Sequence, residues 1–389
     1  MRRFAIVFLA ALTMATLAVP AGASHSRADR LTAMTQNLYV GTDLFELLVP
    51  VPECADFDAL GIPCSVIVQG GRALDDVAAT NYPERAAKIA DLIAVRRPDI
   101  LGLQEVSRVT VIPADPLGNP VGEPVVTDYL QILLDELAAR GLEYQVAASV
   151  DNADIFPVPT GVLTPQGPAI QNLVGLLDRD VILARPGVKV HADTAMGARF
   201  DSAQLSFPLA GQDVEFTRSY VKVDVTVRGR RYAAVNTHLE VEFGPASGPP
   251  LYPAANAIQA AQAGELAKIL SVEDDPIVLL GDFNSAPDSN NGLEGVPTPY
   301  QILAGSGFSD VWNLRSFGSS PGYTCCQAEL LDNPVSDLDE RIDQIWLGPG
   351  LETRWVFANT VGDRPWHKTP SGLWPSDHAG VIGYLGLKR

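Results

Sequence analysis

The chain has 389 residues, of which 47% are hydrophobic and 19% charged, an ordinary composition for a globular protein. Its formal net charge is −18 at pH 7. Because such a surface repels polyanions at long range, the charge argues against a passive nucleic-acid-binding module, which needs a basic face. It does not exclude an enzyme that acts on phosphate esters, since bound metal ions reverse the field locally.

The beginning of the chain has the pattern of an export signal. Two arginines precede an apolar run over residues 4–19, and Ala21-Gly22-Ala23 has the small residues that signal peptidase recognises. We therefore expect residues 1–23 to be a signal peptide and residues 24–389 to form one secreted, extracellular domain. A retained membrane anchor is the alternative, although the run is short for a bilayer span and no other stretch is apolar enough.

Four cysteines are present, and an exported protein can keep disulfides. Four cysteines allow three pairings. Pairing of Cys54 with Cys64, which closes a small loop, is the first expectation, and it leaves Cys325 and Cys326 to pair with each other or to stay reduced. Cross-pairing of the two sites is the rival. A zinc site is not expected, because no Cys-x-x-Cys spacing occurs.

The first quarter of the chain predicts a strand, an insertion, a helix and a second strand. Residues 31–38 alternate as a strand does, and residues 40–80 suggest a loop-rich insertion. A helix with one apolar face is predicted from Pro83 to about residue 95. A short buried strand over residues 100–106 follows.

The second quarter is rich in proline and glycine. Residues 107–127 predict a second loop insertion. A helix is predicted between a cap at Thr127 and a stop at Gly141. The proline-rich stretch 151–170 is expected to be a loop that overlies the active site. Short strands are predicted at 142–148 and 180–184.

The second half contains the clearest hairpin, formed by residues 216–227 and 232–239. A helix over 253–270 and a buried strand over 277–280 follow it. The last strands are predicted at 342–347, 353–357 and 379–385. Because strands outnumber helices and do not alternate strictly with them, the pattern favours an α+β fold over a doubly wound sheet. We expect a four-layer α/β/β/α sandwich of two mixed β-sheets flanked by helices.

Polar and ionisable residues stand at or just after the ends of these predicted strands. Taken singly, each has an ordinary explanation as a turn residue, a cap or a solvated side chain. In a sandwich, however, strand ends can converge on one rim. The set offers hard oxygen ligands for Mg²⁺, Mn²⁺ or Ca²⁺ and two histidines that can transfer protons near neutral pH. Its members are Asn37, Glu105, His238, Asp282, Asn284, Asp343, Asp377 and His378.

The order and local sequence of these residues resemble a known family. The motifs are Gln104-Glu105, Asn236-Thr237-His238-Leu239, Gly281-Asp282-Phe283-Asn284, Arg341-Ile342-Asp343 and Ser376-Asp377-His378. This series resembles the endonuclease/exonuclease/phosphatase superfamily, which includes pancreatic-type deoxyribonucleases, apurinic endonucleases, neutral sphingomyelinases and inositol polyphosphate 5-phosphatases. The resemblance extends over essentially the whole chain after the signal.

The resemblance implies a divalent metal ion, in the first place Mg²⁺. Glu105 would be the principal metal ligand, Asp377 a further carboxylate at the metal, and Asn37 the asparagine beside it. Asp282 and Asn284 would hold the attacking water and the phosphate oxygens.

The resemblance also assigns the groups that move protons. Asp343 would orient His378 as the general base, with Asp282 as the competing base, and His238 would stabilise the leaving oxygen. Arg218 would contact the phosphate. Lesser candidates are Asp43, Asp151, Asn152, Asp154 and His367, whereas His25 and His191 are expected at the surface.

These observations predict a secreted, divalent-metal-dependent phosphoesterase that hydrolyses a phosphodiester by in-line attack of water. The expected substrate is a nucleic acid or a phospholipid head group, and the insertions at 40–80 and 107–127 are expected to select it. We expect a monomer with no membrane span in the mature chain. The alternative is a non-catalytic extracellular binding protein that kept the fold, and the intact motif set argues against it.

Overall fold

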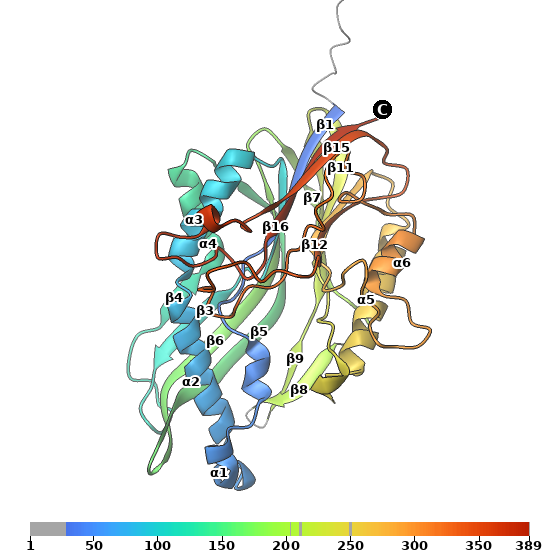
Figure 1. The fold of residues 1–389 in the computed structure, drawn as a ribbon. Coiled ribbons are helices and arrows are strands. Elements are labelled where there is room, and N and C mark those ends of the chain that lie inside the picture. Colours follow the sequence, from blue (N-terminus) through green and yellow to red (C-terminus); the bar gives the residue numbers. More distant parts are fainter. Residues whose placement is uncertain (1–28, 203, 210–211, 249–250, 389) are drawn as a thin grey trace, which may run out of the picture.

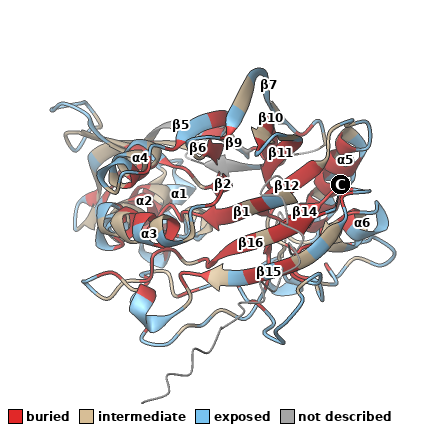
Figure 2. Ribbon diagram, turned by 90° about the horizontal axis from the view of Figure 1, so that it is seen from above, coloured by how far each residue is buried: buried red, intermediate tan, exposed pale blue. Residues whose placement is uncertain are grey.

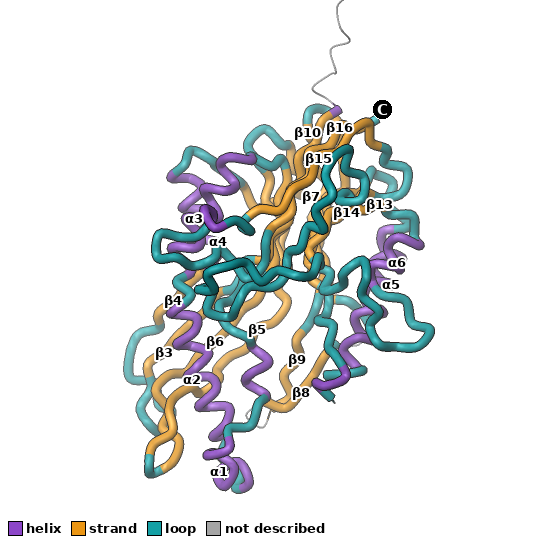
Figure 3. Tube along the Cα trace, viewed as in Figure 1, coloured by secondary structure: helices purple, strands orange, loops and turns teal. Residues whose placement is uncertain are grey.

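The computed structural model describes residues 29–202, 204–209, 212–248 and 251–388, so the expected signal peptide lies outside the described residues. Two mixed β-sheets pack face to face, and helices cover their outer sides (Figures 1 and 3). Buried residues gather in the sheet strands, while exposed residues lie on the outer helices and loops (Figure 2). The predicted four-layer sandwich is therefore confirmed. No helix in the described part of the chain is long and apolar enough to cross a membrane.

The first sheet has eight strands and the order β15-β16-β1-β2-β6-β3-β4, with β5 paired to β6. At its centre β1 and β2 run parallel, with Asn37 opposite Gln104, while β16 is antiparallel to β1. Both parallel strands therefore end at the same edge of the sheet. The strands are β1 Arg30–Asn37, β2 Ile100–Gln104, β3 Arg108–Pro113, β4 Val125–Asp128, β5 Gln145–Thr164, β6 Gly167–Ala184, β15 Thr353–Val361 and β16 Gly380–Leu387.

The second sheet has six strands in the order β13-β14-β12-β11-β10-β7. Its registers place His238 opposite Asp282 and Asp282 opposite Asp343, so three polar residues stand in one row across β11, β12 and β14. The strands are β7 Lys189–Arg199, β10 Ser219–Val227, β11 Arg230–His238, β12 Ile277–Asp282, β13 Ser309–Asp310 and β14 Asp343–Leu347. A separate small sheet pairs β8 Leu205–Leu209 with β9 Gln212–Phe216.

Apolar side chains fill the spaces between the layers. One cluster lies between the two sheets and includes Ile100 and Leu280. A second joins the first sheet to α3 Tyr82–Arg96 and α4 Tyr129–Ala139, and a third joins the second sheet to α5 Ala254–Leu270 and α6 Pro299–Gly305. Burial of this apolar surface is the main force that fixes the strand ends relative to one another.

The segment 40–80 is largely helical, so the prediction of a loop-rich insertion was wrong. Its elements are η2 Leu44–Leu48, η3 Pro52–Cys54, α1 Ala55–Ala59 and α2 Cys64–Ala79. Two glycines in α2 lower its helix propensity, but they allow close packing on β5. A Cβ at Gly70 would lie 2.8 Å from Thr160 Cγ2, and one at Gly71 would clash with the carbonyl oxygen of Gly161.

Two other predicted loops contain strands. Residues 107–127 carry β3 and most of β4, and residues 151–170 form the turn and adjoining arms of the β5–β6 hairpin. The prolines of this stretch had suggested a loop in place of the hairpin. Among the described strands, β5 pairs with β6 alone, so its other edge needs no ladder donors and Pro159 is tolerated there. The cap of α4 is Asp128 rather than Thr127, since the Asp128 carboxylate accepts from the backbone amides of Leu130 and Gln131.

Candidate functional site

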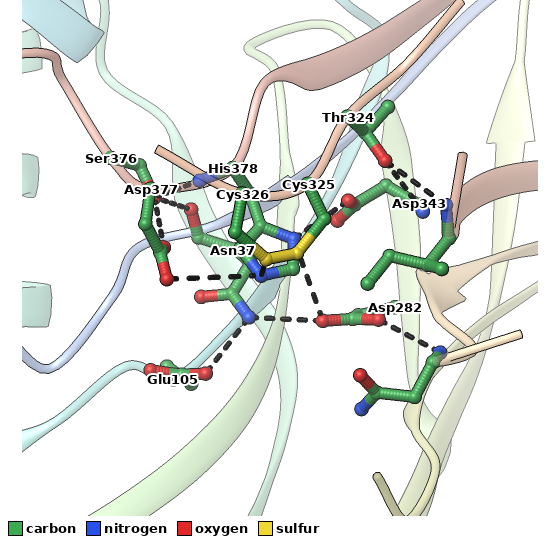
Figure 4. The surroundings of a disulfide bond; sticks show 12 residues. Asn37, Glu105, Asp282, Thr324, Cys325, Cys326, Asp343, Ser376, Asp377 and His378 are labelled. Atoms are coloured by element: carbon green, nitrogen blue, oxygen red, sulfur yellow. Dashed lines mark hydrogen bonds and ion pairs between the residues drawn. A yellow bond between two sulfur atoms is a disulfide. The ribbon is translucent and has the colours of Figure 1, made fainter. Parts of the chain in front are cut away.

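The polar residues predicted from the strand ends meet at one rim of the sandwich, where a cleft opens (Figure 4). Asn37 and Glu105 come from the first sheet, and Asp282 and Asp343 come from the second. Asp377 and His378 lie just before β16 of the first sheet. The predicted residues that line the cleft are Glu105, Arg218, His238, Asp282, Asn284, Asp377 and His378. Asn37 and Asp343 are fully buried and support them from behind.

Asn37 links the two sheets through its side-chain amide. Its Nδ2 donates to Glu105 Oε1 at 2.9 Å and to Asp282 Oδ2 at 3.1 Å. Its Oδ1 accepts from the Tyr39 amide at 2.9 Å, which fixes the orientation of the amide group. The second Glu105 oxygen, Oε2, accepts from the Val40 amide at 3.0 Å. Glu105 has φ 52°, a left-handed conformation that costs a non-glycine residue free energy and is found at functional sites.

His378 is held by Asp343. The His378 Nδ1 lies 2.8 Å from Asp343 Oδ2 and 3.7 Å from Asp282 Oδ2. Asp343 is positioned in turn by its backbone amide, which donates to Thr324 Oγ1 at 3.1 Å. Nδ1 is therefore occupied by Asp343, while Nε2 has only looser neighbours, with Asp377 Oδ2 at 4.0 Å. Nε2 is the atom of His378 that can meet a substrate.

The charges of these groups are strongly linked. Burial alone would lower the pKa of His378, but the carboxylates of Asp343, Asp377 and Asp282 outweigh it and hold this pKa well above its usual value. Burial raises the pKa of Asp343 to about 6. Burial would also raise the pKa of Asp282, but His378 and His238 outweigh it and hold that pKa below its usual value. Asp282 is thus an ionised carboxylate at neutral pH.

His238 lies on the other side of Asp282. Its Nδ1 is 3.1 Å from Arg218 Nη1, and because a guanidinium can only donate, Nδ1 must accept and Nε2 must carry the proton. Nε2 lies 3.6 Å from Asp282 Oδ2, and its 3.1 Å contact with Asn284 Nδ2 joins two N–H groups, so in this tautomer it is not a hydrogen bond. Burial and the Arg218 charge lower the pKa of His238 to about 3, so this imidazole is neutral at pH 7. Arg218 also faces Glu240, with Nη2 3.4 Å from Oε1.

The donor groups at the cleft suit a hard divalent cation. Burial and the negative charge of Glu105 raise the pKa of Asp377 to about 7, which indicates two carboxylates close enough to repel each other. A cation between such groups would relieve that repulsion, and carboxylate oxygens are the ligands that Mg²⁺ and Mn²⁺ prefer. In the same cleft region, one donor atom from each of Asp282, Asp343 and His378 lies within 4.8 Å of the other two.

Asp178 is a cleft residue that sequence reasoning missed. It is part of β6 and lines the cleft, and burial together with the charge of Glu105 raises its pKa to about 6. Asn152 Nδ2 donates to Asp178 Oδ2 at 3.0 Å. The pair Asp178 and Asp180, which stands between the apolar residues 173–177 and 181–184, was the available signal. The predicted strand began only at Asp180, so Asp178 was left outside it.

The four cysteines form two disulfides, Cys54–Cys64 in the insertion and Cys325–Cys326 at the cleft. The first expectation for their pairing is therefore confirmed. Cys326 Sγ lies 3.9 Å from His378 Nε2 (Figure 4). The segment that carries this pair is tied to the last motif, since the Gln327 amide donates to the Asp377 carbonyl at 2.8 Å.

The lesser candidates take different places. Asp43 lines the mouth of the cleft and caps η2. Asn152 does not line the cleft but bonds two residues that do, Asp178 and Thr217, and none of the hydrogen bonds described for it involves His238. His367 is absent from the cleft lining, and its Nδ1 accepts from the Gly362 amide at 3.2 Å. Asp151 and Asp154 do not line the cleft. His191 forms a hydrogen bond with Thr226, and His25 lies outside the described residues.

A four-layer sandwich whose rim gathers two histidines and several carboxylates is the architecture of endonuclease/exonuclease/phosphatase proteins. The family model described as Endonuclease/Exonuclease/phosphatase family matches residues 34–378. The chain therefore belongs to this family. No curated protein sequence matches the chain.

Several solved structures are similar to the chain at low sequence identity. Truncated TDP2 from Caenorhabditis elegans is 15% identical, with 92% of this chain and 97% of that chain covered and a TM-score of 0.48. A mannosyl-6-phosphatase from Bacteroides thetaiotaomicron is 15% identical, with coverage of 91% and 99% and a TM-score of 0.48. A family protein from Leptotrichia buccalis is 14% identical, with coverage of 92% and 100% and a TM-score of 0.48.

Proposed function

We propose that the chain is a secreted, divalent-metal-dependent phosphodiesterase that cleaves its substrate by in-line attack of water. The observation that carries this proposal is the row His378–Asp282–His238, in which one carboxylate lies 3.7 Å and 3.6 Å from the two imidazoles. Hydrolysis of a phosphodiester needs a proton acceptor for water and donors for the phosphate oxygens. This row supplies both within one cleft.

Glu105 and Asp377 would hold the metal ion, with Asn37 fixing Glu105 in place. When bound, the ion would neutralise charge on the phosphate and polarise the phosphorus–oxygen bond. Mg²⁺ is the expected ion, and Mn²⁺ and Ca²⁺ are the alternatives with the same preference for oxygen ligands.

Asp282 is the group that we assign as proton acceptor. Its carboxylate is ionised, and Asn37 Nδ2 and the Asn284 amide fix its two oxygens, at 3.1 Å and 2.9 Å. His378, oriented through Nδ1 by Asp343, would present Nε2–H to a phosphate oxygen. This arrangement favours Asp282 over His378 as the base, the choice that the sequence left open.

His238 and Asn284 would act on the other side of the phosphorus. The neutral His238 carries its proton on Nε2, where it can donate to the leaving oxygen as negative charge develops there. Asn284 Nδ2 lies beside it and donates to the Leu239 carbonyl at 3.0 Å, which keeps the amide in place. Arg218 holds the ring of His238 and adds a positive charge to the phosphate site.

The proposal is tested with a panel of esters offered to purified protein. Bis-p-nitrophenyl phosphate, plasmid DNA, RNA and sphingomyelin vesicles are each incubated with Mg²⁺, Mn²⁺, Ca²⁺ or EDTA. We expect hydrolysis of bis-p-nitrophenyl phosphate and of one natural class, lost in EDTA and in His378→Ala. Metal binding without hydrolysis of any ester would favour the alternative, a binding protein that kept the fold.

A further inference from the structure

An apolar pocket adjoins the cleft and lies between the insertion helices and the β5–β6 hairpin. η2 and α2 supply one wall, which includes Leu47 and Leu74, and the hairpin supplies the other, which includes Ile155. Among the described residues that line this pocket, only Thr42 and Thr160 have a polar side-chain atom. Such a lining cannot recognise a charged or strongly polar group, but it can exclude water from an alkyl chain.

The apolar pocket borders the cleft. Val40, Thr42, Leu44 and Leu176 line both spaces. Val40 also donates its backbone amide to Glu105 Oε2 at 3.0 Å, so the pocket begins directly beside the expected metal ligand. A phosphate bound at the metal would therefore lie close to this apolar space.

The charges of the cleft oppose a polynucleotide. Among its described lining residues, Arg218 is the one lysine or arginine. Eight lining residues are acidic, namely Asp43, Glu105, Asp178, Glu242, Asp282, Glu329, Glu340 and Asp377. A nucleic acid needs cations along several successive phosphates, and its neighbouring phosphates would meet these carboxylates. The cleft instead suits a substrate with a single phosphate, whose charge one metal ion and one arginine can balance.

The far end of the same two walls carries exposed apolar side chains. Leu60 is 78% exposed, Ile62 41% and Val162 44%. They belong to the same end of the molecule, where α1 and the turn of the β5–β6 hairpin both lie (Figure 1), and there Phe57 packs against Gly167. Exposed apolar residues at one end of a molecule are typical of a surface that contacts an apolar partner. Here they add exposed apolar surface beyond the apolar lining of the pocket.

We propose that the pocket binds an alkyl chain of the substrate, so that the enzyme acts on lipid phosphodiesters rather than on nucleic acid. The inference rests on the proposed phosphodiesterase function and names the class of its substrate. The phosphate lies in the cleft, and the chain passes Val40 and Leu44 into the space between α2 and the hairpin. Each methylene that enters should raise kcat/KM about three- to fourfold, as apolar burial does.

The test compares p-nitrophenyl alkyl phosphodiesters from ethyl to decyl, below their micelle concentrations, with plasmid DNA as a competing substrate. Ala73→Phe fills the pocket, and Ala78→Phe places the same ring on the exposed side of α2 as the matched control. We expect kcat/KM to rise at least about 30-fold from ethyl to decyl in the wild type and in Ala78→Phe. In Ala73→Phe the rise should fall below about threefold.

A flat chain-length series in the wild type, an equal rise in Ala73→Phe, or faster cleavage of plasmid DNA than of the decyl ester would overturn the inference. Binding separates this result from a failure of the proposed function. Dodecyl phosphate and ethyl phosphate are titrated into the His378→Ala variant with Mg²⁺. Tighter binding of dodecyl phosphate, abolished by adding Ala73→Phe, supports the pocket even if no ester is hydrolysed. Equal binding of the two phosphates contradicts it even if hydrolysis occurs.

Discussion

Asp282 Oδ2 lies 3.7 Å from His378 Nδ1 and 3.6 Å from His238 Nε2, so a single carboxylate separates the two histidines. The two imidazoles differ in charge at neutral pH. Carboxylates hold the pKa of His378 well above its usual value, while burial and Arg218 lower the pKa of His238 to about 3. One histidine is therefore a charged donor and the other a neutral donor, and the ionised Asp282 between them is left to accept a proton.

Replacement of Asp282 with asparagine should remove the proton acceptor while preserving the size of the side chain. We expect kcat to fall about 10²–10⁴-fold, the usual contribution of a positioned acid or base. The measurement is hydrolysis of bis-p-nitrophenyl phosphate, with circular dichroism to verify the fold. A folded Asp282→Asn protein whose kcat stays within about threefold of the wild type would exclude Asp282 as the base.

Replacement of Asp343 with asparagine should remove a negative charge that stabilises protonated His378. The Asp343→Asn side chain keeps the shape of the carboxylate but lacks the charge that stabilises the imidazolium across 2.8 Å. The pKa of His378 should fall, because one of the three carboxylates that raise it is lost. In the ¹H–¹⁵N spectrum, the His378 ring should then deprotonate at a lower pH than in the wild type. An unchanged titration would contradict the coupling.

Metal affinity should rise with pH between about 6 and 8. The pKa of Asp377 is raised to about 7, and only the ionised carboxylate binds a cation. At pH 6 about nine-tenths of this carboxyl group is protonated, so Mg²⁺ should bind about tenfold more weakly than at pH 8. Calorimetry at both values, with Asp377→Asn as the control, checks this. The control should bind weakly and lose most of the pH dependence, whereas equal affinities for the wild type at the two values would refute the assignment.

Thr324 should matter for the stability of the fold beside the cleft. Its Oγ1 accepts from the backbone amides of Ile342 and Asp343, each at 3.1 Å. Thr324→Val leaves two buried amides without an acceptor, which should lower the free energy of unfolding by about 1–3 kcal/mol. Thr324→Ser keeps the oxygen and should stay close to the wild type. Urea denaturation compares the two variants, and a Thr324→Val protein as stable as the wild type would contradict the role of this oxygen.

Sequence patterns were sufficient for the central strands because burial there dictates the residue types. Residues 100–104 and 277–282 are buried throughout, and apolar runs at both positions predicted strands. The polar residues at their ends stood out against these runs, so Glu105 and Asp282 were identified. The registers across β11, β12 and β14 then brought the predicted residues together.

The periphery could not be predicted in the same way, because tertiary contacts there override local propensity. Gly70 and Gly71 weaken the helical signal of α2, yet they are what allows its packing against β5. Prolines in residues 151–170 suggested a loop, whereas an edge strand accepts them. Asp178 was missed for the same reason, since it belongs to the hairpin that the sequence did not reveal.

The most direct test of the central claim is the rate of bis-p-nitrophenyl phosphate hydrolysis by the purified protein in Mg²⁺ or Mn²⁺ and in EDTA, with His378→Ala alongside. The proposed mechanism predicts turnover that requires the ion, disappears in EDTA and returns when metal is restored. It also predicts a loss of about 10²–10⁴-fold in His378→Ala. Turnover that persists in EDTA, or that is equal in His378→Ala, would contradict a metal-dependent phosphodiesterase built on this cleft.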